Sequence, residues 1–348
     1  MSKSTGNFIL LNEAVQGHRM ITLNDVTKPI GWTADSTRVA LADGGDGLDD
    51  ANFSLDVADT AIMRLYNEIK FAEEAFAAPE PALQSPAHQF HAKVFAARLD
   101  SAIVEADAAY ASMRFRDALV AALFGLQEAR DAYRKACALL REEPSAAVMR
   151  RFVEVMCVTL SPICPHFCDH LWRNVLRRPG SVMDASWPVV GVPDAAVLRA
   201  GDYVAQLETR VRSAVDKQLA KKKTAVGTVT LHVAREVPAL HKRVIDMMRA
   251  LPRGKDLLTR LSVQLKDEIA KPDMKEAMKV AASVHANFEV EGERAFETAL
   301  PFDELATLQL CKDMLAHTLG LDALVVTGEP PANANTEAVP GKPLIVMS

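Results

Sequence analysis

The sequence predicts a mainly α-helical protein with a small α/β part toward its carboxyl end. Apolar residues recur at helical spacing over most of residues 51–180, and only 6% of all residues are aromatic. From residue 228 onward, short alternating apolar runs typical of strands stand between further helical stretches. We therefore expect a loop and helix segment, then a helical bundle, then a small mixed domain.

The composition limits the classes of protein that need to be considered. The chain has 348 residues, of which 49% are hydrophobic and 24% charged, so two or three globular domains are expected. A net charge of -5 offers no general attraction to a polyanion, so an RNA partner would need a local basic face. Five scattered cysteines predict reduced thiols and an intracellular protein. With no long apolar run and no basic-then-apolar leader, we expect neither a membrane span nor a secretory signal.

Residues 1–50 form the first predicted segment. Within it, residues 32–42 have the pattern of a helix, for which Asp35 or Ser36 can act as the cap. The next stretch, residues 43–53, holds four aspartates and invites a calcium-loop interpretation. An EF-hand loop that starts at Asp43 would place Gly45 at position 3 and Ser54 at position 12, which excludes that motif. We expect a loop in which an aspartate caps the following helix.

Residues 51–190 predict an antiparallel helical bundle. Four long stretches have apolar residues at helical spacing, and they are joined by short breaks rich in proline. They cover residues 53–76, 87–110, 115–140 and 146–176.

Residues 200–348 predict the small α/β domain, after a proline- and glycine-rich boundary. Three helices are expected, at residues 238–251, 254–265 and 303–320, after a basic helix at residues 203–223. Residues 228–234, 287–296 and 322–327 have strand-like patterns, and residues 344–347 predict a last strand after a mobile linker.

The first residues have a composition that suits phosphate binding. A lysine charge, hydroxyl donors and a glycine occur together in Ser2-Lys3-Ser4-Thr5-Gly6-Asn7. Such a short stretch is common on protein surfaces, so by itself it is weak evidence for a nucleotide site.

Three separated motifs make that evidence stronger. Residues 1–8, MSKSTGNF, resemble the Lys-Met-Ser-Lys-Ser loop of class I aminoacyl-tRNA synthetases. Together with STRVALADGGDGLDDANF at residues 36–53, they resemble the cytosolic eukaryotic and archaeal type of leucyl-tRNA synthetase. Residues 113–134 and SPICPHFCDHLW at residues 161–172 resemble the anticodon-binding bundle of that family. Isoleucyl- and valyl-tRNA synthetases share the general layout and remain as alternatives.

The resemblance implies a function and a set of residues. Lys3 would be the catalytic lysine that contacts the ATP phosphates, with Ser2 and Ser4 beside it in the ATP-binding loop. The full-length enzyme would use ATP and Mg²⁺ to leucylate tRNA-Leu in the cytoplasm. The family's His-x-Gly-His element, its Rossmann core and its editing domain precede this loop, and they have no counterpart in the sequence. We therefore expect a carboxy-terminal portion that binds tRNA, holds no cofactor alone and is inactive by itself. A non-catalytic tRNA-binding or assembly module remains the alternative.

Cys164, His166, Cys168 and His170 lie within seven residues and invite a zinc interpretation. On a helix, however, residues i and i+2 point to opposite sides, so the cysteines and histidines cannot easily surround one ion. We expect no metal site here. Pro162 and Pro165 would end one helix and begin the next, with Phe167, Leu171 and Val175 as a buried stripe.

Basic residues cluster in two regions and are candidates for tRNA contacts, although solvated helix faces are the alternative. In the bundle these are Arg114, Arg116, Arg130 and Arg134, at spacings that could present a partly basic face. In the second region they are Lys221, Lys222, Lys223, Lys242 and Arg243. Other synthetases in a complex are further candidate partners, whereas we expect no DNA and no membrane partner.

Overall fold

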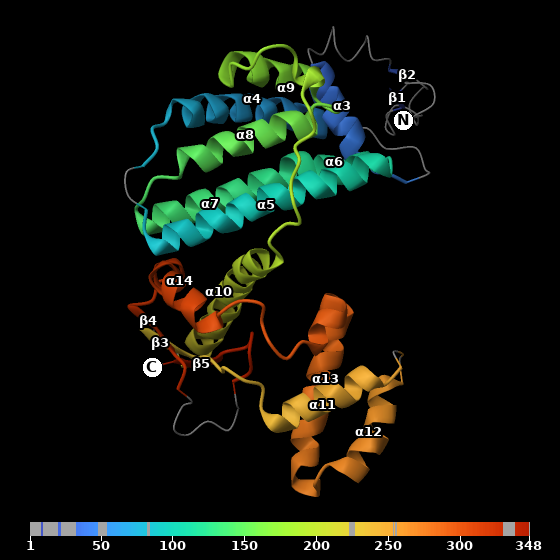
Figure 1. Ribbon diagram of the computed structural model, residues 1–348, viewed down its shortest axis with the longest axis vertical. Helices are drawn as coiled ribbons and strands as arrows, with labels where there is room; N and C mark the ends of the chain where they lie inside the picture. Colours follow the sequence, from blue (N-terminus) through green and yellow to red (C-terminus); the bar gives the residue numbers. More distant parts are fainter. Residues whose placement is uncertain are drawn as a thin grey trace. The chain divides into compact units, whose positions relative to one another are not determined.

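The computed structural model describes residues 8–9, 20–21, 33–47, 54–81, 84–222, 227–252, 254, 256–329 and 338–347. The chain divides into two compact units, Met1–Leu198 and Arg199–Ser348. The described residues are mainly helical, as the sequence predicted (Figure 1). Among them, no helix is both long enough and apolar enough to cross a membrane.

The first unit is a bundle of long helices that lie side by side (Figure 1). Its helices are α3 (Ala34–Asp43), α4 (Leu55–Ala77), α5 (Pro86–Ala111), α6 (Phe115–Leu119), α7 (Gly125–Leu140), α8 (Ala146–Leu160) and α9 (Pro165–His170). A π-helical turn over Val120–Phe124 joins α6 to α7, and another over Leu171–Val175 extends α9. The short strands β1 (Phe8–Ile9) and β2 (Met20–Ile21) pair antiparallel. Three of the four predicted long stretches are helical throughout, and the fourth is divided at residues 161–164 into α8 and α9, as Pro162 and Pro165 predicted.

Local signals place the helix ends of the bundle. Pro86 occupies the first turn of α5, where its absent N–H costs nothing, and Ser85 accepts a hydrogen bond from the His88 N–H. Ser145 caps α8 in the same way. The core draws buried side chains from all the helices α3 to α9, and each large one contributes roughly 1.5–3 kcal/mol by leaving water. The largest are Phe95, Leu99, Ile103, Leu119, Leu123, Leu126, Phe152, Met156, Leu160 and Leu171.

The second unit contains a three-stranded sheet and a separate group of helices. Strand β3 (Thr228–His232) lies between β4 (Ala323–Thr327), which is parallel to it, and β5 (Leu344–Met347), which is antiparallel. A parallel pair needs a long crossover, and here the connection contains α11 (Ala239–Ala250), α12 (Leu257–Glu268), α13 (Met274–Glu291) and α14 (Glu304–Leu319). Helix α10 (Ala195–Lys222) precedes β3, and α14 contacts β4. Helices α11, α12 and α13 share a core that includes Val244, Leu261 and Ala281.

One predicted strand is wrong. Residues 287–296 are the end of α13 and a 3-10 turn, Gly292–Phe296, instead of a strand. The Phe288 and Phe296 rings lie 5.4 Å apart and pack against the helical core, so tertiary packing outweighs the local alternation. Gly292 ends the helix at a positive φ of 61°, which glycine adopts readily.

The predicted linker before the last strand is described in part. Residues 330–337 lie outside the described residues. Val339 and Lys342 form a β-bridge across a tight turn. The Gly341 N–H in that turn donates to Glu304 Oε2 at 2.9 Å, so the turn is tied to the first residue of α14.

Candidate functional site

The predicted ATP-loop residues Ser2, Lys3 and Ser4 lie outside the described residues. Their roles therefore stay predictions. In the described part of the first segment, α3 is the helix whose polar side chains contact other elements.

Thr33 is the cap of α3. Its hydroxyl accepts a hydrogen bond from the Ser36 N–H at 3.1 Å, and its backbone is extended, with φ -77° and ψ 157°. The prediction that Asp35 or Ser36 is the cap is wrong because both residues already lie inside the first helical turn, where the backbone is helical. The Asp35 carboxylate does not cap its own helix, so it is available to accept hydrogen bonds from another helix.

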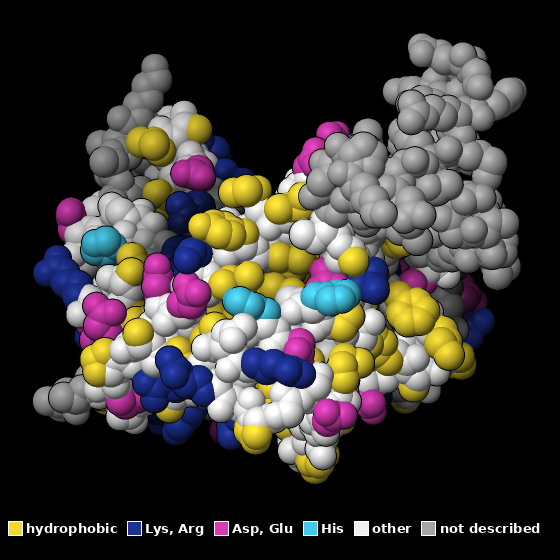
Figure 2. Space-filling view, turned by 90° about the horizontal axis from the view of Figure 1, so that it is seen from above, with side chains coloured by type: hydrophobic (Ala, Val, Ile, Leu, Met, Phe, Trp, Pro, Cys, Tyr) yellow, Lys and Arg dark blue, Asp and Glu magenta, His cyan; other side chains and the backbone are white. Residues whose placement is uncertain are grey.

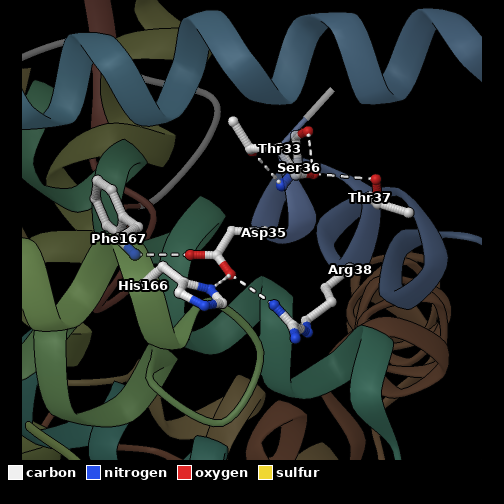
Figure 3. A network of polar contacts seen from close by, with 7 residues as sticks. All are labelled: Thr33, Asp35, Ser36, Thr37, Arg38, His166 and Phe167. Carbon is white, nitrogen blue, oxygen red and sulfur yellow. Dashed lines mark hydrogen bonds and ion pairs between the residues drawn. The ribbon is translucent and has the colours of Figure 1, made fainter. Parts of the chain in front are cut away.

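Asp35 connects α3 to α9, as Figure 3 shows. Its Oδ2 accepts from the Phe167 N–H at 2.7 Å. Its Oδ1 lies 3.1 Å from His166 Nδ1 and 2.9 Å from an Arg38 guanidinium nitrogen. Cys164, at the cap position of α9, makes no side-chain capping bond. A carboxylate from another helix therefore satisfies the beginning of α9, where the helix dipole favours negative charge.

The segment that invited a zinc interpretation has the predicted geometry. Cys164 and Cys168 are buried, whereas His166 and His170 are exposed on the other side of α9. The stripe of Phe167, Leu171 and Val175 is buried, and α9 begins at Pro165, as predicted. Burial raises the pKa of both thiols, which opposes the thiolate form that a metal would require. In the described part of the chain, no group of three His, Cys, Asp or Glu side chains is placed to hold a metal ion.

An aspartate of the glycine-rich loop caps a distant helix instead of the following one. Asp46 accepts from the Arg116 N–H at 2.9 Å and from the Asp117 N–H at 3.3 Å, which satisfies the beginning of α6. The cap position of α4 is Ser54. The prediction that an aspartate caps the next helix is therefore wrong, because the tertiary fold brings this loop to α6.

The first two arginines of the predicted basic face lie beside acidic side chains. The Arg116 guanidinium lies 3.6 Å from the Asp43 carboxylate, and the Arg114 guanidinium lies 3.1 Å from the Asp117 carboxylate. Both arginine side chains are more than half exposed. Exposed pairs of this kind contribute little stability, so these charges remain accessible to a ligand.

Arg130 does not belong to an exposed basic face. Its side chain is 10% exposed, and one guanidinium nitrogen donates to both oxygens of the buried Glu68 carboxylate at 2.6 Å. It also stacks over the Phe71 ring, at 4.5 Å from the centroid. A buried guanidinium must be paired, so Arg130 is committed to the core, and the expectation that it faces solvent is corrected. Arg134 is exposed, and its guanidinium lies 5.4 Å from the centroid of the Phe71 ring.

The basic residues of the second unit lie on two helices. Lys221 is exposed near the end of α10, and Lys222 is the last residue of that helix. Lys223 lies outside the described residues. Lys242 and Arg243 are exposed on α11, where Arg243 lies 3.5 Å from Glu268. Their contacts with RNA stay predictions.

Sequence reasoning missed Asp35, Glu68 and His166 as members of polar networks. For Asp35, the sequence did contain one sign that a distant acceptor was needed. A helix that begins at Pro165 after a cysteine lacks a local Ser, Thr, Asp or Asn cap, so its N–H groups need an acceptor from elsewhere. Nothing in the sequence identified which carboxylate would supply it.

Comparisons with known proteins identify what this chain resembles. Residues 92–230 match the model of the anticodon-binding domain of tRNA ligase. The chain is 32% identical over 369 residues to the cytoplasmic leucine–tRNA ligase of Pongo abelii. This alignment covers 100% of the chain and 29% of that protein. It is 31% identical to the cytoplasmic enzyme of Dictyostelium discoideum, covering 99% and 32%, and 30% identical to the leucine–tRNA ligase of Aeropyrum pernix, covering 99% and 33%. The chain thus spans about a third or less of the length of these relatives, and the resemblance seen in the sequence is confirmed.

Proposed function

We propose that this chain, which is homologous over its whole length to leucine–tRNA ligases, binds leucine tRNA through its helical bundle in the course of tRNA leucylation. The observation that carries this proposal is the end-to-end match to those ligases, together with an anticodon-binding domain over residues 92–230. The match to ligases named for leucine supports leucine over the isoleucine and valine alternatives.

The charges of the bundle support a binding mode that depends on individual contacts. Arg114, Arg116 and Arg134 are exposed, but acidic side chains stand beside the first two. Such a surface does not attract RNA through a strong general field, since the net charge of the protein is -5. We propose that these arginines contact phosphates one by one, with Lys221, Lys222, Lys223, Lys242 and Arg243 as further contacts.

The activity of the whole enzyme is proposed for a polypeptide that includes the rest of the matched relatives. ATP and Mg²⁺ would serve leucine activation there. Lys3, with Ser2 and Ser4 beside it, would place a cation where negative charge develops on the departing pyrophosphate. We propose the cytoplasm as the location, because several relatives carry that description, and other synthetases as candidate partners.

Binding of purified chain to a leucine tRNA transcript, measured by gel shift at 50 and 200 mM salt, tests the proposal. We expect binding at low salt that weakens steeply at high salt, because phosphate contacts release counterions. An isoleucine tRNA transcript serves as the competitor and should compete less well. Absence of binding at low salt would contradict the proposal.

A matched pair of variants separates a specific basic site from a general charge effect. Changing Lys221, Lys222 and Lys223 to glutamate should weaken binding strongly. Changing three exposed lysines of the 271–279 region, Lys271, Lys275 and Lys279, to glutamate alters the net charge equally and should have a smaller effect. Equal losses from both triple variants would show that only net charge matters.

A further inference from the structure

A pocket of about 410 Å³ opens in the first unit between α3, α6 and the turn that follows α8. Its volume falls in the range of pockets that hold a small organic group. Apolar side chains form most of its wall, and one arginine stands in it. They include Leu41, Ala42, Met113, Phe115, Ile163 and Arg38. We call this the α3–α6 pocket. None of the functions proposed above uses it.

Two large hydrophobic side chains of the α3–α6 pocket are held in exposed positions. Met113 is 73% exposed and Phe115 is 45% exposed. Met113 has a φ of 56°, in the left-handed region that costs free energy for a residue other than glycine. Its N–H donates to the Tyr110 carbonyl at 3.0 Å, which fixes the turn. The left-handed backbone ends α5, because the Arg114 N–H also donates to the Ala109 carbonyl at 2.9 Å. This helix end leaves the apolar Met113 side chain facing solvent.

The Phe115 ring is oriented by its neighbours. It lies edge-to-face with Tyr110, at 6.5 Å between ring centroids. The Tyr110 hydroxyl is anchored to the Thr159 carbonyl at 3.0 Å. Tyr110 therefore packs against the Phe115 ring, while nearly half of the Phe115 surface remains exposed and can stack against a flat partner.

Charged groups beside the pocket suit one negative charge. Arg38 and His166 both contact Asp35, which holds them at the surface with side-chain exposures of 43% and 72%. The hydrogen bond that joins His166 Nδ1 to Asp35 leaves Nε2 on the opposite side of the ring. Figure 2 shows the molecule from the side on which α9 lies in Figure 1, where histidine, basic and acidic side chains lie among hydrophobic ones.

Acidic neighbours exclude a strongly anionic ligand. Asp46 lines the pocket, but backbone N–H groups engage both of its oxygens. Asp43 is paired with Arg116, and Asp35 is shared by Arg38 and His166. The surroundings are close to neutral, so they offer too little positive charge to balance a triphosphate, whereas a flat base that carries a single phosphodiester needs only one cationic or hydrogen-bonding contact.

We propose that the α3–α6 pocket receives one unstacked nucleotide of the bound tRNA. The base would stack on Phe115 and contact Met113, and its phosphate would lie at Arg38 and His166. Proteins read unpaired RNA bases by stacking them on aromatic side chains in this way. The inference rests on the proposed function, since it assumes that the bundle binds tRNA.

The test compares variants of the full chain against two RNA probes. The probes are a leucine tRNA transcript and a perfectly paired RNA duplex of similar length. Loss of one stacked base should make Phe115→Ala bind the transcript about 10-fold more weakly. Binding of the duplex should not change, because it offers no unpaired base. Phe115→Trp should retain tight binding, and the fluorescence of its added tryptophan should be quenched by the transcript.

Val120→Ala is the matched control, since this side chain is similarly exposed at 44% on the same helical run but does not line the pocket. It should bind both probes like the unsubstituted chain. Arg38→Gln and His166→Gln test the phosphate contact and should each weaken binding to the transcript more than to the duplex. Circular dichroism and urea unfolding confirm that each variant is folded.

The outcomes separate the two proposals. If the unsubstituted chain binds no tRNA, the proposed function fails. If it binds tRNA but Phe115→Ala binds equally well, the α3–α6 pocket does not receive a nucleotide. Equal losses of transcript and duplex binding in Phe115→Ala would also overturn the inference, because they would show a general defect. If the pocket instead accepts a protein side chain, the chain should bind tRNA and Phe115→Ala should bind it equally well.

Discussion

The Asp35 carboxylate accepts a hydrogen bond from the backbone N–H of Phe167 at 2.7 Å, across 132 positions of sequence. This single contact joins the helix that follows the predicted ATP-loop segment to the last helix of the bundle. The Asp35 side chain is 5% exposed and three donors surround it, so the contact is desolvated and fully satisfied. A buried carboxylate with three partners stabilises the packing of α3 on α9, whereas the same group without partners would oppose it.

Replacing Asp35 by alanine should destabilise the first unit by about 2–4 kcal/mol, because a buried acceptor of three hydrogen bonds is lost. Urea unfolding followed by circular dichroism measures the change. Thr33→Ala is the control, since it removes only the local cap of α3 and should cost about 1 kcal/mol. A loss below 1 kcal/mol for Asp35→Ala would show that water replaces the carboxylate.

The buried Glu68–Arg130 pair predicts strong non-additivity. Removing either charge alone, as in Glu68→Leu or Arg130→Met, should cost about 3–5 kcal/mol, because the partner is left charged and buried. The double variant should lie within about 2 kcal/mol of the unsubstituted protein, since no charge then remains unpaired. Additive losses in a double-mutant cycle, measured by urea unfolding, would contradict this account.

His91 predicts a loss of stability in acid. Burial lowers its pKa to about 4 from 6.5, and the neighbouring His88 adds to the effect. Because the folded-state pKa is lowered, the contribution to stability is complete above pH 6.5 and is lost as the pH falls toward 4. The difference in unfolding free energy between the unsubstituted chain and His91→Gln should shift by on the order of 2–3 kcal/mol between pH 7.5 and pH 4.

The control is Gln89→Ala, because Gln89 is exposed on the same helix, α5, and carries no titratable group. Its pH dependence should match that of the unsubstituted protein. If His91→Gln also keeps the full acid dependence, another group is responsible for it.

The cysteines should be unreactive in the folded protein. All five are buried and none forms a disulfide, and burial raises the pKa of the Cys137 thiol to about 11 and that of Cys311 to about 12. A thiol must be exposed and deprotonated to react, so a thiol reagent at pH 7.5 should modify none of them quickly. All five should react in urea. Rapid reaction of even one thiol without denaturant would indicate local opening.

The bundle arginines should control the salt dependence of tRNA binding. Changing Arg114, Arg116 and Arg134 to glutamine should weaken binding and lower the slope of log K against log salt by up to about one per lost phosphate contact. Arg173→Gln removes an exposed arginine that is paired with Asp169 on another part of the bundle, and it should leave the slope unchanged. An unchanged slope in the triple variant would exclude these arginines as phosphate contacts.

Part of the fold could be predicted because its signals are local. The stripe of Phe167, Leu171 and Val175, the proline start of α9 and the Gly320 end of α14 follow from spacing and from the backbone preferences of single residues. The strand predicted at residues 287–296 failed because alternation over a few residues fits both a strand and a helix end. Packing of Phe288 on Phe296 decides between them.

The candidate site was less predictable, because the sequence shows which residues are charged but does not show which of them are buried. Arg114, Arg116, Arg130 and Arg134 look alike at the level of spacing. The fold places Arg130 against Glu68 in the core and leaves the other three exposed. The capping roles of Asp35 and Asp46 likewise depend on helices far away in the chain.

The sequence by itself determined the helical class, most of the helix positions and the resemblance to leucine–tRNA ligases, because periodicity and motifs are properties of neighbouring residues. Only the tertiary structure decided which carboxylate caps which helix, which arginine is buried, and that Met113, Phe115 and Arg38 meet at one pocket. The physical reason is that burial and charge pairing arise between segments that are distant in the chain.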